Sequence, residues 1–449
     1  MVQDPRLKRN LWHRFCRKTT KLKKTEKIRD CLLDTELCLT KASVFSDFDK
    51  RLSPKERIFS WSIQKYAIEL STDTTFRKTE KYTNWFLHRD SSGAFHHRTI
   101  ADFIERTGMS FNEAIDSHVT EILEANNFNP ETALPNDPES LPDSVKKPNV
   151  IPEKEIIEEV EGATREYNAT HEEFPITVIP DNFVPELSRS GKIVLLSIDD
   201  VLVKRQKDER TPEFVKEKQN VANTVIHIQA DGKGYILNAV GIKQAFRILV
   251  AFLLENNLLE DRQLVFLSDG AKEIKEYIQK FFSWRPYILI LDWFHLAKRI
   301  KELISMCLKL YKDKKGPIIK KILNHLWVGD TDGAIAYIQS FKSSIIKNEK
   351  VHKEMIAYLQ RKKENICCHA LRRLFNLRLS SNAAEKSNDI VVADRQKHNG
   401  MSWSFDGSGA LAVLKAACKN NTLDLWITER KISMSLKDSG WKMESNYAA

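Results

Sequence analysis

Cysteine is scarce in this chain, and long apolar runs are missing. The 449 residues include seven cysteines, an odd number without a repeated spacing, which argues against a secreted disulfide framework and favours a reducing cytoplasm. The most apolar stretch, around Ile248, is interrupted by Arg247 and is too short to cross a bilayer. The start of the chain has no apolar segment typical of a signal peptide. We therefore expect a soluble, cytoplasmic protein without a membrane partner.

Paired cysteine motifs are also missing, which bears on metal binding. His13, Cys16, Cys31 and Cys38 match no common zinc finger, because no CxxC pair is present among them. The Cys-Cys-His sequence at residues 367–369 is too short to form a site alone. The sequence therefore does not favour a zinc centre.

Positive charge, by contrast, is in excess. The chain has 71 Lys and Arg residues against 61 Asp and Glu residues, a formal net charge of +10. Such a balance favours polyanionic partners, nucleic acid above all. Residues 1–50 form a basic N-terminal segment, densest between Arg6 and Arg29. This segment is either a solvated tail or an arm that binds nucleic acid.

Residues 51–129 are expected to be helical and to bind DNA. Two short helices on either side of a glycine-containing turn at residues 91–93 predict a helix-turn-helix, whose second helix would present His97, Arg98 and Thr99 to a groove of DNA. An ordinary helical bundle is the alternative. Closely spaced prolines and a following acidic stretch predict an interdomain linker at residues 130–190. The acidic part either forms a short helix or shields a basic groove.

From Gly191 onward, strand-like and helix-like patterns alternate. Three strands in succession are followed by helix, strand, helix, strand and helix over residues 191–311. This order predicts a mixed α/β sheet with helices on both faces, and it is the order of ribonuclease H-like cores. Residues 312–375 are predicted to be an all-helical insertion, residues 376–430 the second part of the core, and residues 431–449 a C-terminal tail.

Carboxylates follow the predicted buried strands. Asp199, Asp269 and Asp292 each come at a strand end, where ligands bind in α/β sheets. The strands of Asp199 and Asp269 are expected to be neighbours, so the two carboxylates would repel each other unless a cation lies between them, and oxygen ligands suit Mg²⁺ or Mn²⁺. Asp269 and Asp292 could instead cap the helices that follow them. Strand alternation allows either Asp199 or Asp200 to face the site.

A third metal ligand is expected from a later helix. Ser381 or Asn382 would cap that helix, and Glu385 would lie in its first turn. The alternative is that Glu385 is only a capping or dipole residue, a frequent role at this position.

Four segments carry a resemblance to a known family: "IDDVLVKRQ", "LVFLSDGAKEI", "LILDWFHLAKRI" and "NAAEKSNDIVVADRQKHNGMSW". Together they resemble the DDE-type transposases of bacterial insertion sequences, in the group related to Mutator-like elements. The resemblance implies a ribonuclease H-like fold in which Asp199, Asp269 and Glu385 bind two Mg²⁺ ions, with Mn²⁺ as a substitute. It further implies that His295 and Asp292 form an accessory pair, in which His295 either contacts the scissile phosphate or is structural.

The resemblance also implies the partners and the reaction. The expected activity is DNA strand cleavage followed by strand transfer, at terminal inverted repeats read by the helical region, with target DNA as second substrate and a homo-oligomer assembled on DNA. Arg395 and Lys397 are expected to contact DNA or to be solvated at the surface. A ribonuclease H-like nuclease or resolvase, and a catalytically silent DNA-binding protein derived from a transposase, are the alternative functions.

Overall fold

The computed structural model describes residues 61–86, 95–147, 154–177, 192–206, 220–397 and 401–439. The basic segment at residues 1–50, with its four possible zinc ligands, lies outside these ranges. The strands are β1 (Ile193–Lys204), β2 (Asn220–Ala230), β3 (Lys233–Val240), β4 (Gln263–Ser268) and β5 (Ile288–Leu291). The helices before the sheet are α4 (Trp61–Asp73), α5 (Phe76–Phe86), α6 (His97–Ala125), η2 (Pro138–Ser140), α7 (Asp143–Lys146) and α8 (Lys154–Thr170). Those that follow strands are α10 (Ile242–Glu255), α11 (Lys272–Phe282) and α12 (Trp293–Cys307).

The remaining helices follow α12. Those of the insertion are α13 (Lys312–Trp327), α14 (Thr331–Gln339), η4 (Ser343–Ile345), α15 (Glu349–Lys362), η5 (Lys363–Asn365) and α16 (His369–Leu374). The last group is α17 (Asn382–Asn388), the π-helical η6 (Asp389–Ala393), α18 (Asp394–Gln396), α19 (Phe405–Asn420) and α20 (Leu423–Glu429). No helix in the described ranges is both long enough and apolar enough to span a membrane.

The five described strands form one mixed sheet in the order β3-β2-β1-β4-β5. β1 pairs antiparallel with β2, and β2 with β3, whereas β1, β4 and β5 run parallel. The hairpin between β2 and β3 turns at Asp231 and Gly232, which both have positive φ angles, as a tight two-residue turn requires. The predicted mixed sheet and its predicted strand order along the chain are confirmed.

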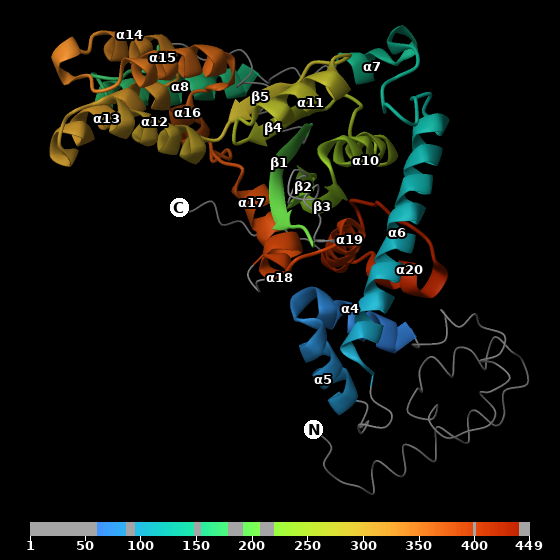
Figure 1. Cartoon of the computed structure of the whole chain (residues 1–449). Coiled ribbons are helices and arrows are strands. Elements are labelled where there is room, and N and C mark those ends of the chain that lie inside the picture. Colours follow the sequence, from blue (N-terminus) through green and yellow to red (C-terminus); the bar gives the residue numbers. More distant parts are fainter. Residues whose placement is uncertain are drawn as a thin grey trace, which may run out of the picture.

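Helices cover both faces of this sheet (Figure 1). Val194, Leu196 and Ile198 of β1 pack in one apolar cluster with α10 and α11. Val201 and Val203 of the same strand belong to a second cluster, which contains residues of η6 and α19. Because side chains alternate along a strand, the even-numbered positions of β1 face α10 and the odd-numbered positions face the helices that follow residue 381.

The helix-turn-helix prediction does not describe the length of α6. The second helix is predicted to be short, but α6 continues for 29 residues and runs alongside the sheet domain (Figure 1). A Cβ atom at Gly108 would lie 2.5 Å from Ala410 of α19, so this glycine permits close packing of two helices and does not end one. Ile100 and Phe111 of α6 lie in the cluster that includes β1 and α19. The described part of residues 61–129 therefore shares its core with the sheet.

The predicted linker and tail are also packed where they are described. Ala133 and Val145 from the proline-rich stretch, and Met434 and Leu436 from the predicted tail, are buried in the cluster that contains α10. The acidic stretch forms α8, as one of the two interpretations expected, and its Ile156 packs with residues near α16. Apolar residues placed between the prolines and charges explain why these segments dock on the core.

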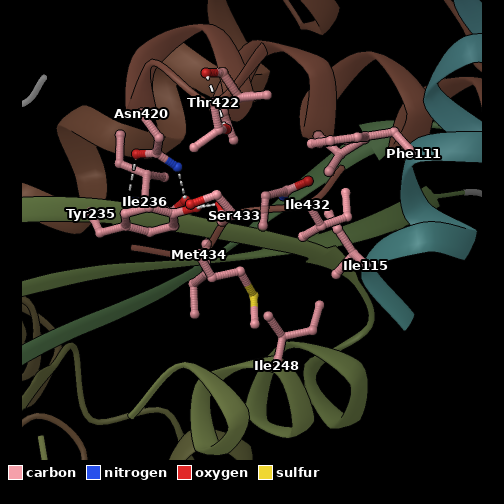
Figure 2. Close-up of a pocket in the computed structure, with 15 residues that line it drawn as sticks. Phe111, Ile115, Tyr235, Ile236, Ile248, Asn420, Thr422, Ile432, Ser433 and Met434 are labelled. Carbon is pink, nitrogen blue, oxygen red and sulfur yellow. Dashed lines mark hydrogen bonds between the residues drawn. The ribbon is translucent and has the colours of Figure 1, made fainter. Parts of the chain in front are cut away.

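A small cavity lies at the outer edge of the sheet, between α6, β3, α19 and residues 432–434 (Figure 2). Asn420 satisfies the free edge of β3, because its side chain accepts a hydrogen bond from the Ile236 amide at 3.0 Å and donates one to the Ile236 carbonyl at 2.8 Å. The cavity measures about 30 Å³, which is the scale of a water molecule and not of a substrate. None of the predicted site residues lines it.

Candidate active site

Three aspartates form a row across the parallel part of the sheet. In the pairing of β1 with β4, Ser197 lies opposite Leu267, and Asp199 and Asp269 each follow two residues later. In the pairing of β4 with β5, Ser268 lies opposite Leu291, and Asp269 and Asp292 are the next residues. The register therefore brings the three acids together, although Asp199 lies within β1 and not at its end as the sequence predicted, because β1 continues to Lys204 beside β2.

The structure separates Asp199 from Asp200. Asp199 is at an odd-numbered position of β1, and its Oδ2 accepts a hydrogen bond of 2.6 Å from Asn388 Nδ2 at the end of α17. Asp200 points to the opposite face and accepts a hydrogen bond from the hydroxyl of Thr224. Only Asp199 therefore faces the helix that carries Glu385.

Asp269 begins the turn from β4 into α11. Its Oδ1 accepts a hydrogen bond of 2.8 Å from the Ala271 amide, as expected for an aspartate in such a turn. Gly270 has a φ of +87°, and a Cβ atom there would lie 2.6 Å from Leu291. The tight turn places Asp269 between the other two acids of the row.

Asp292 connects the end of β5 with the starts of α12 and α17 through hydrogen bonds. It is fully buried, and its Oδ1 accepts a hydrogen bond of 2.9 Å from the His295 amide, which caps α12 as one sequence interpretation expected. Its Oδ2 accepts hydrogen bonds from the amide and hydroxyl of Ser381, at the start of α17. Burial opposes ionisation, but the contacts with His295 and Ser381 outweigh it and lower the pKa of Asp292. Asp292 therefore fixes the position of α17 relative to β5.

Glu385 and His295 complete the group. Glu385 lies in the first turn of α17, and its Oε1 is 3.6 Å from His295 Nε2. His295 Nδ1 lies 3.3 Å from Asp292 Oδ1. The contact with Asp292 raises the pKa of His295, more than its partial burial lowers it, and Glu385 and Asp269 add to the increase.

The carboxylates of this group repel one another. Burial, together with the nearby charges of Asp269 and Glu385, raises the pKa of Asp199 to about 6, against the hydrogen bonds from Asn388 and the Asp200 amide. A divalent cation would relieve this repulsion, because it favours the charged form of each carboxylate.

The donor atoms present are those that Mg²⁺ prefers. Asp199, Asp269 and Glu385 supply carboxylate oxygens, and the amide oxygen of Asn388 is buried without a hydrogen-bond partner among the described residues. As the side chains are placed, no set of three or more His, Cys, Asp or Glu residues in the described ranges is arranged to hold a metal ion. The residue types fit the ion, and the Glu385 carboxylate lies 3.6 Å from His295.

Two residues of this region have no role in the sequence prediction. Asn388 follows Glu385 by three residues, and this spacing places both on one face of a helix. That signal was available in the sequence. Lys362, at the end of α15, donates a hydrogen bond of 2.6 Å to the carbonyl of Gly270, beside Asp269. This contact links the helical insertion to the carboxylate row, and no local sequence pattern indicates it.

The residues predicted to contact DNA lie apart from this row. His97 begins α6, and its Nδ1 is 2.9 Å from Glu80 Oε2. Arg98 is exposed, Thr99 is half-buried, and Lys397 is exposed at the end of α18. Of these four side chains, only His97 has a described side-chain partner in α5.

Arg395 does not agree with either sequence interpretation. It was expected to contact DNA or solvent, but only 1% of it is exposed. Its guanidinium lies 4.9 Å from the ring centre of Phe76 and 5.0 Å from that of Trp403, and its Nε donates a hydrogen bond of 2.9 Å to the carbonyl of Ser71. The two aromatic rings and the carbonyl replace water as its environment.

Compared with models of protein families, with curated proteins and with solved structures, the chain gives no significant match.

Proposed function

We propose that this chain is a DDE-type transposase with a ribonuclease H-like core, which cleaves and joins DNA strands with two Mg²⁺ ions. The observation that carries the proposal is the alignment of Asp199 and Asp269 on adjacent parallel strands, on the face covered by the Glu385 helix. The sheet order β3-β2-β1-β4-β5, antiparallel in its first half and parallel in its second, supports the core assignment. The net charge of +10 favours a DNA substrate.

Asp199, Asp269 and Glu385 would hold the metal ions. When bound, a Mg²⁺ pair stabilises the charge on the attacking and leaving oxygens of a phosphodiester during in-line displacement. Asn388 donates to Oδ2 of Asp199 and the Asp200 amide donates to Oδ1, so that both oxygens are held in place and their remaining lone pairs would be available to the metal. Asp292 holds the first turn of α17 through Ser381, so that Glu385 faces the strand ends. His295 lies between Asp292 and Glu385, where a protonated imidazole can neutralise negative charge.

Lys362 brings a positive charge from the helical insertion to the candidate active site. Its ammonium group lies beside Asp269 while its helix belongs to the insertion. A positively charged ammonium group beside the carboxylates is suited to contact a negatively charged substrate phosphate. The insertion would then supply a cation to the site in addition to covering it.

The test uses purified full-length protein and labelled duplexes taken from the DNA that flanks its coding region. With Mg²⁺ and a target plasmid, we expect nicked duplex and then covalent joining of the labelled 3′ end to the plasmid, both lost on chelation. Cleavage without joining would support the nuclease alternative. Absence of both products, with binding intact, would contradict an active enzyme.

Asn388 should affect metal use more than stability. We expect Asn388→Ala to raise the Mg²⁺ concentration for half-maximal cleavage by about tenfold, because residues that orient metal ligands typically contribute 10- to 100-fold. Asn382→Ala is the matched control, since this exposed asparagine begins the same helix. A Mg²⁺ titration of cleavage measures the effect. Equal curves for the two variants would show that Asn388 does not orient Asp199.

A further inference from the structure

One face of α5 combines basic and aromatic side chains. Arg77, Lys81 and Trp85 follow one another at intervals of four residues, and Lys78 and Tyr82 flank them, so all five lie on the same side of the helix. All five are exposed, Tyr82 by 42% and Trp85 by 69%. We call these five residues the α5 face. Within the described part of the chain, the side chains of these five residues form no ion pair, hydrogen bond or ring contact.

The opposite side of α5 is bound to the protein. Thr79 and Thr83 are buried. Glu80 is the one acidic residue of the helix. Its Oε2 accepts a hydrogen bond from the amide of His97, at the start of α6, and also lies 2.9 Å from Nδ1 of the His97 ring. Asn84 accepts a hydrogen bond from the Phe95 amide at 2.8 Å and donates one to the Phe95 carbonyl at 2.9 Å. The first turn of α6 is therefore held against α5, whereas the α5 face points away.

Arg395 connects this helix to the candidate active site. Its guanidinium packs on Phe76, the first residue of α5, and donates to Ser71 at the end of α4. Arg395 lies in α18, which continues through η6 from the helix of Glu385. Ten residues separate the two side chains along this helical segment, or about 15 Å at 1.5 Å per residue. A molecule bound on the α5 face would thus be held at a constant distance from the carboxylates.

We propose that α5, and not the start of α6, is the helix that contacts duplex DNA, through the α5 face. This inference rests on the proposed function, because it names the surface by which the DNA substrate is held. Arg77, Lys78 and Lys81 contact phosphates or base edges, and Tyr82 and Trp85 pack on sugars and on the edges of bases. Arg395 is buried and does not contact DNA itself, but it holds α5 in a fixed position relative to Glu385.

Charge and size favour duplex DNA as the occupant. A second copy of the chain would bring three like charges against three others, which costs free energy at close range. An α-helix with its side chains is about 10–12 Å across, and the major groove of DNA is about 12 Å wide, so the groove can accept α5. Exposed aromatic residues beside cations are typical of nucleic-acid surfaces.

The test compares charge-matched double variants of the full-length protein. Arg77→Ala/Lys81→Ala removes two charges from the α5 face, and Lys243→Ala/Lys280→Ala removes two exposed charges from α10 and α11, on the other side of the sheet. Fluorescence anisotropy with a labelled duplex from the flanking DNA gives the affinity at several salt concentrations. We expect the first variant to bind about tenfold more weakly and to lower the salt slope by about two, since each lost phosphate contact lowers it by about 0.9. The control should change little.

Trp85→Ala separates packing from charge. We expect about fivefold weaker binding with an unchanged salt slope, because contact of the uncharged ring with sugars and base edges releases no phosphate counterions. Equal binding by the wild type and by both α5 variants would overturn the inference. Equal competition by a duplex RNA of the same sequence would overturn the assignment to DNA. Weakened binding by the α5 variants in a protein that cleaves no DNA would support the surface and contradict the proposed enzyme, so the two failures are distinguishable.

Discussion

Asp199→Asn is expected to abolish Mg²⁺-dependent DNA cleavage, whereas Asp200→Asn is expected to retain most of it. The two residues are adjacent in sequence but face opposite sides of β1, and only Asp199 meets Asn388 and the Glu385 helix. Asparagine at position 199 keeps the shape of the side chain and can still accept the hydrogen bond from Asn388, but it removes the negative charge that a cation requires. A metal contributes several kcal/mol to the transition state, so the rate should fall by about 10³-fold or more.

The comparison of these two variants is informative because the same substitution, which replaces one carboxylate oxygen by an amide nitrogen, is made at two adjacent residues. Cleavage rates of labelled duplex at saturating Mg²⁺ give the primary measurement, and DNA affinity of the same preparations shows whether binding survives. Thermal unfolding identifies any loss of fold. If Asp200→Asn were inactive and Asp199→Asn active, the metal site would lie on the α11 face of the sheet. If both retained full activity, the carboxylate row would have no catalytic role.

The sheet and the carboxylate row could be predicted from sequence for a simple reason. Strands buried on both faces appear as apolar runs, and each run in the parallel part ends at an acid: Asp199, Asp269 or Asp292. The order of strands and helices then predicts which runs are neighbours. Alternation along β1, however, allows either Asp199 or Asp200 to face the site. Only the positions of α17 and α11 on opposite faces distinguish them.

Other features depend on contacts between distant parts of the chain. Arg395 carries no local signal that Phe76 and Trp403 will enclose its guanidinium, because these rings are far away in sequence. Gly108 likewise carries no local signal of its contact, because glycine beside a helical pattern indicates a helix end more often than a close contact between two helices. The helix-turn-helix interpretation assigned DNA contact to the start of α6 and gave no role to the exposed side of α5. Local rules predict elements well, but they do not predict which faces other elements will cover.

Gly108→Ala is expected to destabilise the protein by about 3 kcal/mol, which is the upper range for overpacking a tight contact. A Cβ atom at this position would lie 2.5 Å from the Cα, the Cβ and the carbonyl oxygen of Ala410. Because two of these atoms belong to the backbone of α19, no side-chain rotation can relieve the clash, and α6 and α19 must move apart. Urea unfolding followed by circular dichroism measures the change as a lower midpoint.

Gly162→Ala is the matched control, since Gly162 also lies inside a helix but has no atom within 4 Å of the position of a Cβ. Alanine has the higher helix propensity, so this variant should be more stable by about 0.5–1 kcal/mol. The same substitution should therefore lower the free energy of unfolding in α6 and raise it in α8. Displacement of α19 should also affect the candidate active site, because Ser408 of α19 donates a hydrogen bond to Gln396, which ends the helical segment of Glu385. A Gly108→Ala protein as stable and as active as the wild type would mean that α6 does not pack against α19 in solution, and that the described part of residues 61–129 is a separate domain.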